Sequence, residues 1–192
     1  MARIRPDVAL VTLDLDVSRF PRAGEILGTK VMQVDIERID PKITEGLGQF
    51  ECVVFCEIFE HLRINILGTI TALGSLVSPG GILYLTMPNG LGLSAWLTKY
   101  AKGRTGPDPV AEWRKLSDIG HMGHVREYSL REVRSVLEAC GFAIDCYFFR
   151  RQSAFRGTWR SRIRDMAQMV ATNLVPSLGD EIVVVARRSD SV

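Results

Sequence analysis

The segment FECVVFCEIFEHLRINILGTITALGSLVSPGGILYLTMPN, residues 50–89, contains a complete strand–helix–strand pattern. Residues 50–59 are almost all apolar, which predicts a strand buried on both faces. Leucine and isoleucine then recur at helical spacing over 60–77, and SPGG at 78–81 is a strong stop signal for that helix. Residues 82–89 predict a second buried strand. Strands that alternate with helices in this way indicate an α/β fold built on a parallel sheet.

The same alternation continues on both sides of this segment. Two strands are predicted before it, at 8–16 and 30–40, each ending in acidic residues. After it come an irregular glycine-rich stretch (90–128), an amphipathic helix (129–142), a strand (142–149), an arginine-rich helix (about 157–173) and a strand (180–188). The helix at 129–142 has Ser129 as N-cap and Glu132 at the capping-box position. We find no repeat or linker, so the sequence predicts one doubly wound domain over 1–192.

Composition excludes several classes of protein. The 24 basic residues nearly balance the 22 acidic ones, so the net charge gives no strong attraction to DNA or to an anionic membrane. The N-terminus has no long apolar run after its arginines, so it does not read as a signal peptide, and no stretch approaches the ~18 apolar residues of a membrane span. The four cysteines form no CxxC pair, which predicts reduced core thiols in a cytoplasmic protein.

Acidic side chains end three successive predicted strands. Ligands of doubly wound sheets bind outside the carboxyl ends of the strands. Asp14 or Asp16 could therefore accept hydrogen bonds from the hydroxyls of a ribose. Asp35 could bind an adenine amino group, although it could equally cap a turn. The predicted cofactor-binding residues are Asp14, Asp16, Asp35, Ile36 (which would pack on the adenine ring), Cys56 and Glu57.

The order of motifs resembles class I S-adenosylmethionine-dependent methyltransferases of the E-x-x-E-H subgroup, from about residue 8 to residue 188. FECVVFCEIFEHL (50–62) is similar to the fourth strand of that family and its E-x-x-E-H continuation. LGSLVSPGGILYLTMPN (73–89) is similar to the segment that leads into the fifth strand, and GHVREYSLREVRSVLEACGF (123–142) to the segment that follows. The resemblance implies a Rossmann-like, mostly parallel sheet with an antiparallel C-terminal strand, and S-adenosylmethionine as cofactor.

One family motif has no counterpart in this chain. Family members begin with a strand that ends in a D-x-G-x-G-x-G loop, whose backbone amides approach the cofactor. LDLDVSRF (13–20) carries no glycine and fits the second strand better. We therefore expect the first strand to be missing, which would leave two inner edges unpaired unless the second strand pairs directly with the fourth. We also expect this chain alone to bind the cofactor weakly or not at all.

The E-x-x-E-H residues Glu57, Glu60 and His61 allow three interpretations. Glu57 could position the cofactor or acceptor while Glu60 and His61 only begin a helix. His61 could be a general base that takes a proton from an acceptor hydroxyl. Because positions i, i+3 and i+4 share a helix face, the three could also bind a divalent metal ion.

The resemblance supports the metal site. In small-RNA 2′-O-methyltransferases and ubiquinone-pathway O-methyltransferases, this motif and a later histidine bind a magnesium-type ion. It implies Glu57, Glu60, His61 and His124 as ligands here, with His61 and His124 as catalytic residues. The ion would be Mg²⁺ or another divalent cation and would acidify the acceptor hydroxyl.

The remaining segments bear on the acceptor. Residues 90–128 fall where the family has its acceptor-side lid, and Trp96, Tyr100 and Trp113 would line an apolar wall. Residues 150–164 are rich in arginine and could bind an anionic lipid or phosphorylated sugar, or simply be a solvated helix face. The sequence thus predicts methyl transfer to oxygen of a small molecule, a glycan or a lipid-linked intermediate.

Two other functions compete with that reading. The chain could be a truncated or degenerate relative that acts as an interaction subunit, which the missing glycine loop favours. It could also be a nucleotide-dependent oxidoreductase, but it lacks the G-x-G-x-x-G pattern of that class.

Overall fold

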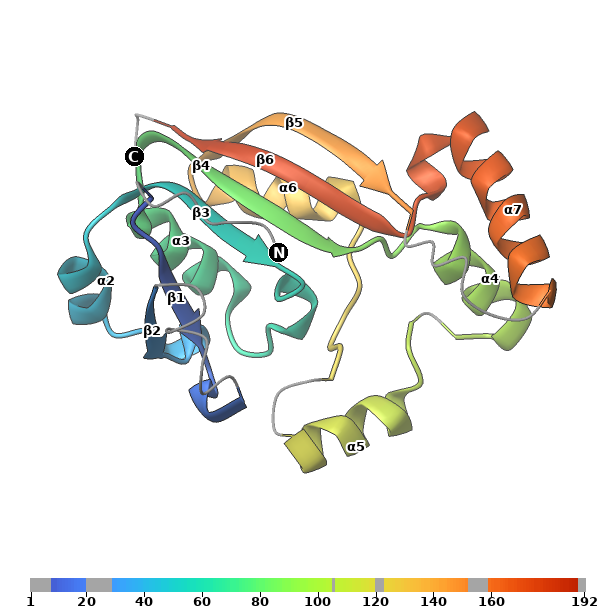
Figure 1. Ribbon diagram of the computed structural model, residues 1–192, viewed down its shortest axis with the longest axis horizontal. Helices are drawn as coiled ribbons and strands as arrows, with labels where there is room; N and C mark the ends of the chain where they lie inside the picture. Colours follow the sequence, from blue (N-terminus) through green and yellow to red (C-terminus); the bar gives the residue numbers. More distant parts are fainter. Residues whose placement is uncertain (1–7, 20–28, 105, 120–122, 152–158, 190–192) are drawn as a thin grey trace.

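The computed structural model describes residues 8–19, 29–104, 106–119, 123–151 and 159–189 (Figure 1). Every predicted strand is present in these ranges. The strands are β1 (Val11–Asp14), β2 (Lys30–Gln33), β3 (Phe50–Cys56), β4 (Val77–Pro88), β5 (Phe142–Arg150) and β6 (Glu181–Arg188).

The strands form two sheets. β1 and β2 pair in parallel as a two-stranded sheet, and the other four have the order β3-β4-β6-β5. β3 and β4 are parallel, whereas β6 runs antiparallel to both of its neighbours. The expectation of a Rossmann-like mixed sheet closed by an antiparallel C-terminal strand is therefore confirmed.

No strand pairing joins the two sheets among the described residues. Among the described residues β1 pairs only with β2, and β3 pairs only with β4. Direct pairing of the expected second and fourth strands is thus wrong. β3 is an edge strand in which Phe55 is buried while Val54 is 64% exposed, so burial of 50–59 on both faces is wrong too. Cys52 and Cys146 are exposed rather than core thiols.

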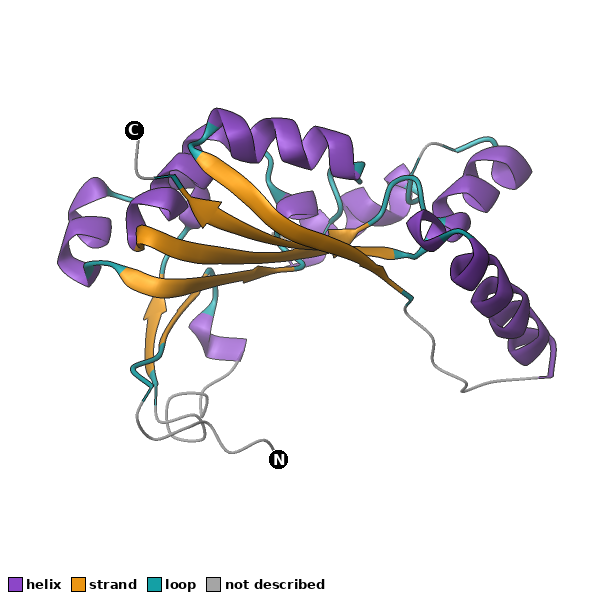
Figure 2. Ribbon diagram, turned by 90° about the horizontal axis from the view of Figure 1, so that it is seen from above, coloured by secondary structure: helices purple, strands orange, loops and turns teal. Residues whose placement is uncertain are grey.

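Two helices cover the four-stranded sheet on one face, as Figure 2 shows. α3 (Ile66–Leu76) packs against β3 and β4, α6 (Leu130–Ala139) packs against β5, and the two helices contact each other. The core lies between these helices and the sheet. Its fully buried side chains include Phe59, Ile70, Leu83, Leu85, Val133 and Leu137.

The helices between β3 and α6 differ from the prediction in three places. α3 begins at Ile66 rather than at residue 60, because the Asn65 side chain caps it and the preceding residues form the short 3-10 helix η3 (Phe59–His61). The stretch expected to be irregular contains α4 (Leu93–Lys102) and α5 (Pro109–Ile119).

The remaining helical segments complete the chain. α7 (Trp159–Leu174) agrees with the predicted arginine-rich helix, whereas α2 (Pro41–Leu47) was not predicted. Asp40 caps α2, with Pro41 in its first turn. The other 3-10 helices are η1 (Val17–Arg19), η2 (Ile36–Arg38) and η4 (Pro176–Leu178). Within the described ranges, none of the helices is long and apolar enough to cross a membrane.

The capping box of α6 is formed as predicted and gives a first test of stability. Ser129 accepts from the backbone N–H of Glu132, and the Glu132 carboxylate accepts from the backbone N–H of Ser129 at 2.8 Å. We expect Ser129→Ala to lower the free energy of unfolding by about 1 kcal/mol, measured by urea denaturation. Ser135→Ala, on the exposed side of the same helix, is the control. Equal losses in the two variants would show that the cap does not contribute.

Candidate functional site

The turn after β3 sets the geometry of the E-x-x-E-H residues. Glu57 has φ +54°, the left-handed region that a non-glycine residue rarely occupies. Its backbone N–H donates to the carbonyl of Thr86 on β4, and its carboxylate accepts from the Thr86 hydroxyl, both at 2.9 Å. Glu60 and His61 lie in η3. The three residues therefore do not share one helix face, and that part of the sequence argument is wrong.

A distant segment lies across η3 and brings in His124. The backbone N–H groups of Val125 and Arg126 donate to the carbonyl of Glu60, at 2.9 and 3.3 Å. Tyr128 is buried with its ring edge-on to Phe59, the centroids 4.9 Å apart. These contacts fix the segment against η3, so that His124 lies beside Glu60 although 63 residues separate them in sequence.

Glu60, His61 and His124 form a compact cluster. The Glu60 side chain is only 1% exposed, and among the described residues neither of its carboxylate oxygens has a hydrogen-bond partner. Its Oε1 lies 3.7 Å from Nε2 of His61 and 4.0 Å from Nε2 of His124. The two imidazole rings are 4.8 Å apart. These separations are too long for hydrogen bonds but short enough for all three groups to contact one cation.

The protonation of the cluster follows from burial and neighbouring charges. Burial raises the pKa of Glu60 to about 7. Burial also lowers the pKa of His61, which favours its neutral form. The pKa of His124 is instead raised, chiefly by the carboxylate of Glu127, 3.9 Å from its Nδ1. Around neutral pH the site thus holds a neutral imidazole, a more basic one and a carboxyl that is partly protonated.

Neighbouring groups fix both histidines. Nδ1 of His61 lies 3.0 Å from the Gly123 carbonyl, which can only accept, so Nδ1 donates and the lone pair remains on Nε2, toward Glu60. The backbone N–H of His124 donates to Glu112 on α5 at 2.8 Å. Burial raises the pKa of Glu112, but hydrogen bonds from Lys115 and from His124 outweigh it and leave the pKa lowered.

Sequence reasoning missed two acidic residues of this site. Glu127 lies three positions after His124, a spacing that could have marked it. The sequence around Glu112 does not mark it as a site residue, because only the fold brings α5 next to His124. Arg126 lines the pocket described below and pairs with Glu132, and Tyr128 packs in the core.

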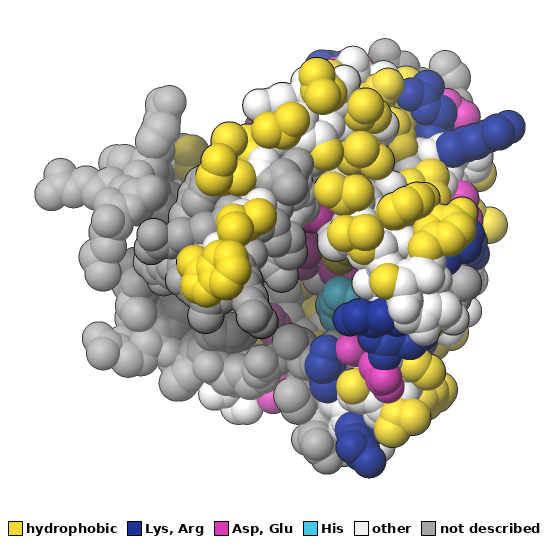
Figure 3. Space-filling view, turned by 90° about the vertical axis from the view of Figure 1, so that its right-hand side faces the viewer, with side chains coloured by type: hydrophobic (Ala, Val, Ile, Leu, Met, Phe, Trp, Pro, Cys, Tyr) yellow, Lys and Arg dark blue, Asp and Glu magenta, His cyan; other side chains and the backbone are white. Residues whose placement is uncertain are grey.

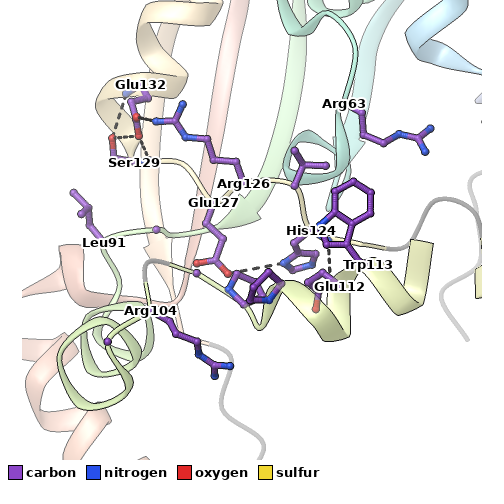
Figure 4. A pocket seen from close by; sticks show the side chains of 16 residues that line it. Arg63, Leu91, Arg104, Glu112, Trp113, His124, Arg126, Glu127, Ser129 and Glu132 are labelled. Atoms are coloured by element: carbon purple, nitrogen blue, oxygen red, sulfur yellow. Dashed lines mark hydrogen bonds and ion pairs between the residues drawn. The ribbon is translucent and has the colours of Figure 1, made fainter. Parts of the chain in front are cut away.

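A pocket of about 1070 Å³ opens beside the cluster (Figure 4). His124 and Glu127 line it together with Glu112 and Trp113 of α5. Of the predicted apolar wall, only Trp113 lines this pocket. Trp96 and Tyr100 lie on α4, 50% and 66% exposed, with their rings 4.7 Å apart. The pocket wall is thus mixed rather than apolar.

The predicted cofactor-binding acids lie at the ends of β1 and β2. One carboxylate oxygen of Asp14 accepts from the Asp16 N–H at 2.8 Å, and one of Asp35 accepts from the Glu37 N–H at 3.0 Å. Asp35 thus caps a turn, as the alternative reading allowed. Among the described residues the second oxygens of Asp14 and Asp35 have no hydrogen-bond partner, and they can accept from a ligand.

The two sheets are linked at this edge. The Glu37 side chain accepts from the backbone N–H of Ile64 at 2.7 Å, which ties the end of β2 to the loop after η3. Ile36 packs against the core, so only part of its surface is available to a ring. Cys56 is half-buried at the end of β3. The predicted cofactor side and the cluster are therefore connected through one loop.

The comparisons with solved structures report on the fold. A methyltransferase of Mesorhizobium loti described as S-adenosylmethionine dependent superposes with TM-score 0.58 at 15% identity, over 94% of this chain and 80% of that one. A putative methyltransferase of Bacillus halodurans gives TM-score 0.59 at 14% identity, over 95% and 84%. NodS of Bradyrhizobium japonicum, an N-methyltransferase solved with S-adenosyl-L-homocysteine, gives 0.52 at 12%, over 94% and 66%.

The sequence comparison reports on the family. A search among curated proteins finds no matching sequence. The model of the methyltransferase domain family, in contrast, matches residues 8–147, which include the acidic strand ends, the E-x-x-E-H motif and His124. That match covers well over half of the chain and agrees with the fold of the solved structures. The chain therefore belongs to the methyltransferase domain family, whose enzymes transfer a methyl group from S-adenosylmethionine.

Proposed function

We propose that this methyltransferase methylates a hydroxyl oxygen of a small molecule, a glycan or a lipid-linked intermediate bound in the pocket beside His124. One observation carries the proposal: the buried Glu60 carboxylate, without a hydrogen-bond partner among the described residues, faces two imidazoles. A buried carboxylate of this kind is costly unless a proton or a cation compensates it. Residues 90–128, with α4 and α5, would form the acceptor-side lid.

The donor set of the cluster fits a divalent metal ion. Glu60, His61 and His124 can each offer one ligand atom, and these atoms lie within 4.8 Å of one another. A carboxylate with two imidazoles is a common set for a transition metal, and additional water ligands would suit Mg²⁺. Glu57 remains a fourth candidate ligand, but here its carboxylate bonds to Thr86. When bound, such an ion would make the acceptor hydroxyl more acidic.

The reaction itself needs mainly alignment and removal of one proton. The acceptor oxygen attacks the methyl carbon, the carbon–sulfur bond breaks, and its electron pair leaves with S-adenosylhomocysteine. Glu127, whose carboxylate lines the pocket beside His124, can take the hydroxyl proton. In a metal-independent variant of this mechanism, His61 would be the general base; burial lowers its pKa, which keeps the imidazole neutral and able to accept a proton. Dependence of the rate on added ion distinguishes the two.

The cofactor would bind at the ends of the parallel strands. The second carboxylate oxygen of Asp14, or the carboxylate of Asp16, would accept from the ribose hydroxyls, and the second oxygen of Asp35 from the adenine amino group. Cys56 and Glu57, at the end of β3, would lie toward the methionine part.

The Asp35 assignment can be tested without disturbing the turn. Asp35→Asn keeps an oxygen that can cap η2 but removes the charge. We expect it to weaken binding of S-adenosylhomocysteine roughly tenfold, because charge-assisted hydrogen bonds are about twice as strong as neutral ones. Isothermal titration measures the change. Asp40→Asn, which caps α2 in the same way, is the control. Equal affinities of the two variants would remove Asp35 from the site.

Titration of S-adenosylhomocysteine also separates the proposed enzyme from the interaction subunit. It is run on this chain and on a form extended upstream to any encoded glycine-rich loop. Binding by either form, followed by ion-dependent methyl transfer to a hydroxylated acceptor, supports the proposal. If neither form binds S-adenosylhomocysteine, the proposal is contradicted and the interaction subunit is favoured.

A further inference from the structure

The helix α7 carries a row of exposed apolar side chains. Ile163, Met166, Val170 and Leu174 are 58%, 56%, 56% and 78% exposed. Their spacing of three and four residues places them on one face of the helix. On another side of α7, Asp165 is buried and Gln168 donates to the Asp180 carboxylate. α7 is therefore attached through polar groups and presents an apolar face outward.

The neighbouring helix α4 extends this surface. Trp96, Leu97 and Tyr100 are 50%, 45% and 66% exposed and also lie within two turns on one side. The hydroxyl of Ser94 on α4 donates to the same Asp180 that binds Gln168 of α7, so the two helices meet at one residue. Apolar side chains gather over this end of the molecule in Figure 3. We name the exposed apolar residues of α4 and α7 the end face.

The segments that carry the end face are richer in basic than in acidic residues in sequence. Residues 150–164 contain six arginines and no acidic residue, and three of them, Arg160, Arg162 and Arg164, fall within α7. α4 contains Lys99 and Lys102 and no acidic residue. The single acid of α7, Asp165, is 6% exposed. Apart from Asp180, which is engaged by Ser94 and Gln168, these two segments of the sequence thus carry an excess of basic residues despite the near-zero net charge of the whole chain.

The combination of exposed apolar side chains with basic residues decides which partner the end face fits. A second copy of the chain would meet it across a two-fold axis, which brings the same basic segments together and costs free energy. An anionic lipid surface instead complements the charge and takes up the apolar side chains. Tryptophan and tyrosine beside lysine and arginine are typical of groups at the lipid headgroup level. We propose that the end face docks the protein onto the surface of a bilayer that contains anionic lipids.

Docking in this way has a consequence for the pocket. Leu91 and Arg104, which lie just before and just after α4, both line it. The pocket would then open next to the lipid headgroups, which suits an acceptor carried in the membrane. That consequence rests on the proposed function, whereas docking itself does not.

Vesicle binding tests the proposal. The full chain is floated with vesicles of phosphatidylcholine alone and with vesicles of phosphatidylcholine and phosphatidylglycerol, roughly three to one. We expect binding to the mixed vesicles only, weakened by added salt. Ile163→Ser with Val170→Ser should reduce it at least tenfold, since both apolar contacts are lost. Arg160→Gln with Arg162→Gln should reduce it by roughly tenfold or more, because each basic residue contributes about fivefold.

Matched variants keep the test specific. Ile64→Ser with Leu67→Ser removes two apolar side chains of similar exposure, 53% and 51%, at the start of α3, which lies away from α4 and α7 in Figure 1, and should bind like the parent chain. Circular dichroism shows that each variant is folded. Absence of binding to the mixed vesicles, or equal loss in this control, would overturn the proposal. So would dimerisation of the parent chain that Ile163→Ser with Val170→Ser abolishes, since a second copy would then occupy the face.

Discussion

Replacing Glu60 by glutamine is expected to weaken binding of a divalent ion by roughly a hundredfold or more and to lower the methyl-transfer rate by a similar factor. Glu60 is the buried carboxylate of the cluster, and both histidine Nε2 atoms lie within 4.0 Å of it. Glutamine has nearly the same shape but no charge, so the pocket should keep its form. Titration of Mn²⁺ into the cofactor-free protein measures the affinity independently of activity.

Glu138→Gln is the matched control for this experiment. Glu138 lies on the exposed side of α6, away from the cluster, and its variant should bind the ion and react like the parent chain. If the parent chain binds no divalent ion, the metal site fails. A rate loss in Glu60→Gln without any ion dependence would instead favour His61 as a general base.

The stability of the metal-free protein should fall as the pH rises, through Glu60. The pKa of this carboxyl is about 7 in the folded protein against 4.5 for an ordinary glutamate, because burial penalises its charge. The folded state therefore binds the proton more tightly than the unfolded state. The stabilisation is complete below pH 4.5 and is lost as the pH rises to about 7 and beyond. The loss amounts to about 3 kcal/mol of unfolding free energy.

Comparison of two proteins isolates this effect from the histidines, whose pKa values shift in opposite directions. Urea denaturation at pH 5 and pH 8 is performed on the parent chain and on Glu60→Gln. We expect the variant to be the more stable protein at pH 8 by about 3 kcal/mol without metal, and a saturating divalent ion to restore the parent chain. If the unfolding free energy of both proteins depends on pH in the same way, the charge of Glu60 does not affect stability.

Much of the fold could be predicted from local patterns. The strands, the capping box at Ser129 and the arginine-rich helix depend on residues close in sequence, and the structure contains all of them. The errors lie where local preference does not decide. Residues 60–65 have a helical apolar pattern, but the strained turn at Glu57 and the cap at Asn65 delay α3 until Ile66. Burial of β3 depends on its neighbours, which the sequence of the strand does not contain.

The candidate site was only partly predictable. Glu60 and His61 were identified from the sequence, but on a helix-face argument that the turn at Glu57 contradicts. His124 entered through the family resemblance. Glu112 and Glu127 were missed, although one anchors the backbone of His124 and the other raises its pKa.

The sequence by itself determined the α/β alternation, the membership in the methyltransferase domain family and the residue types available for chemistry. Hydrophobic periodicity and helix capping involve residues close in sequence, so they can be recognised without a structure. Only the tertiary structure decided that Glu60, His61 and His124 converge while Glu57 turns toward Thr86. That convergence depends on backbone hydrogen bonds between η3 and the segment around Val125, which join residues more than sixty positions apart. No local pattern encodes such contacts, because they form only when β3, β4 and α6 pack around one core.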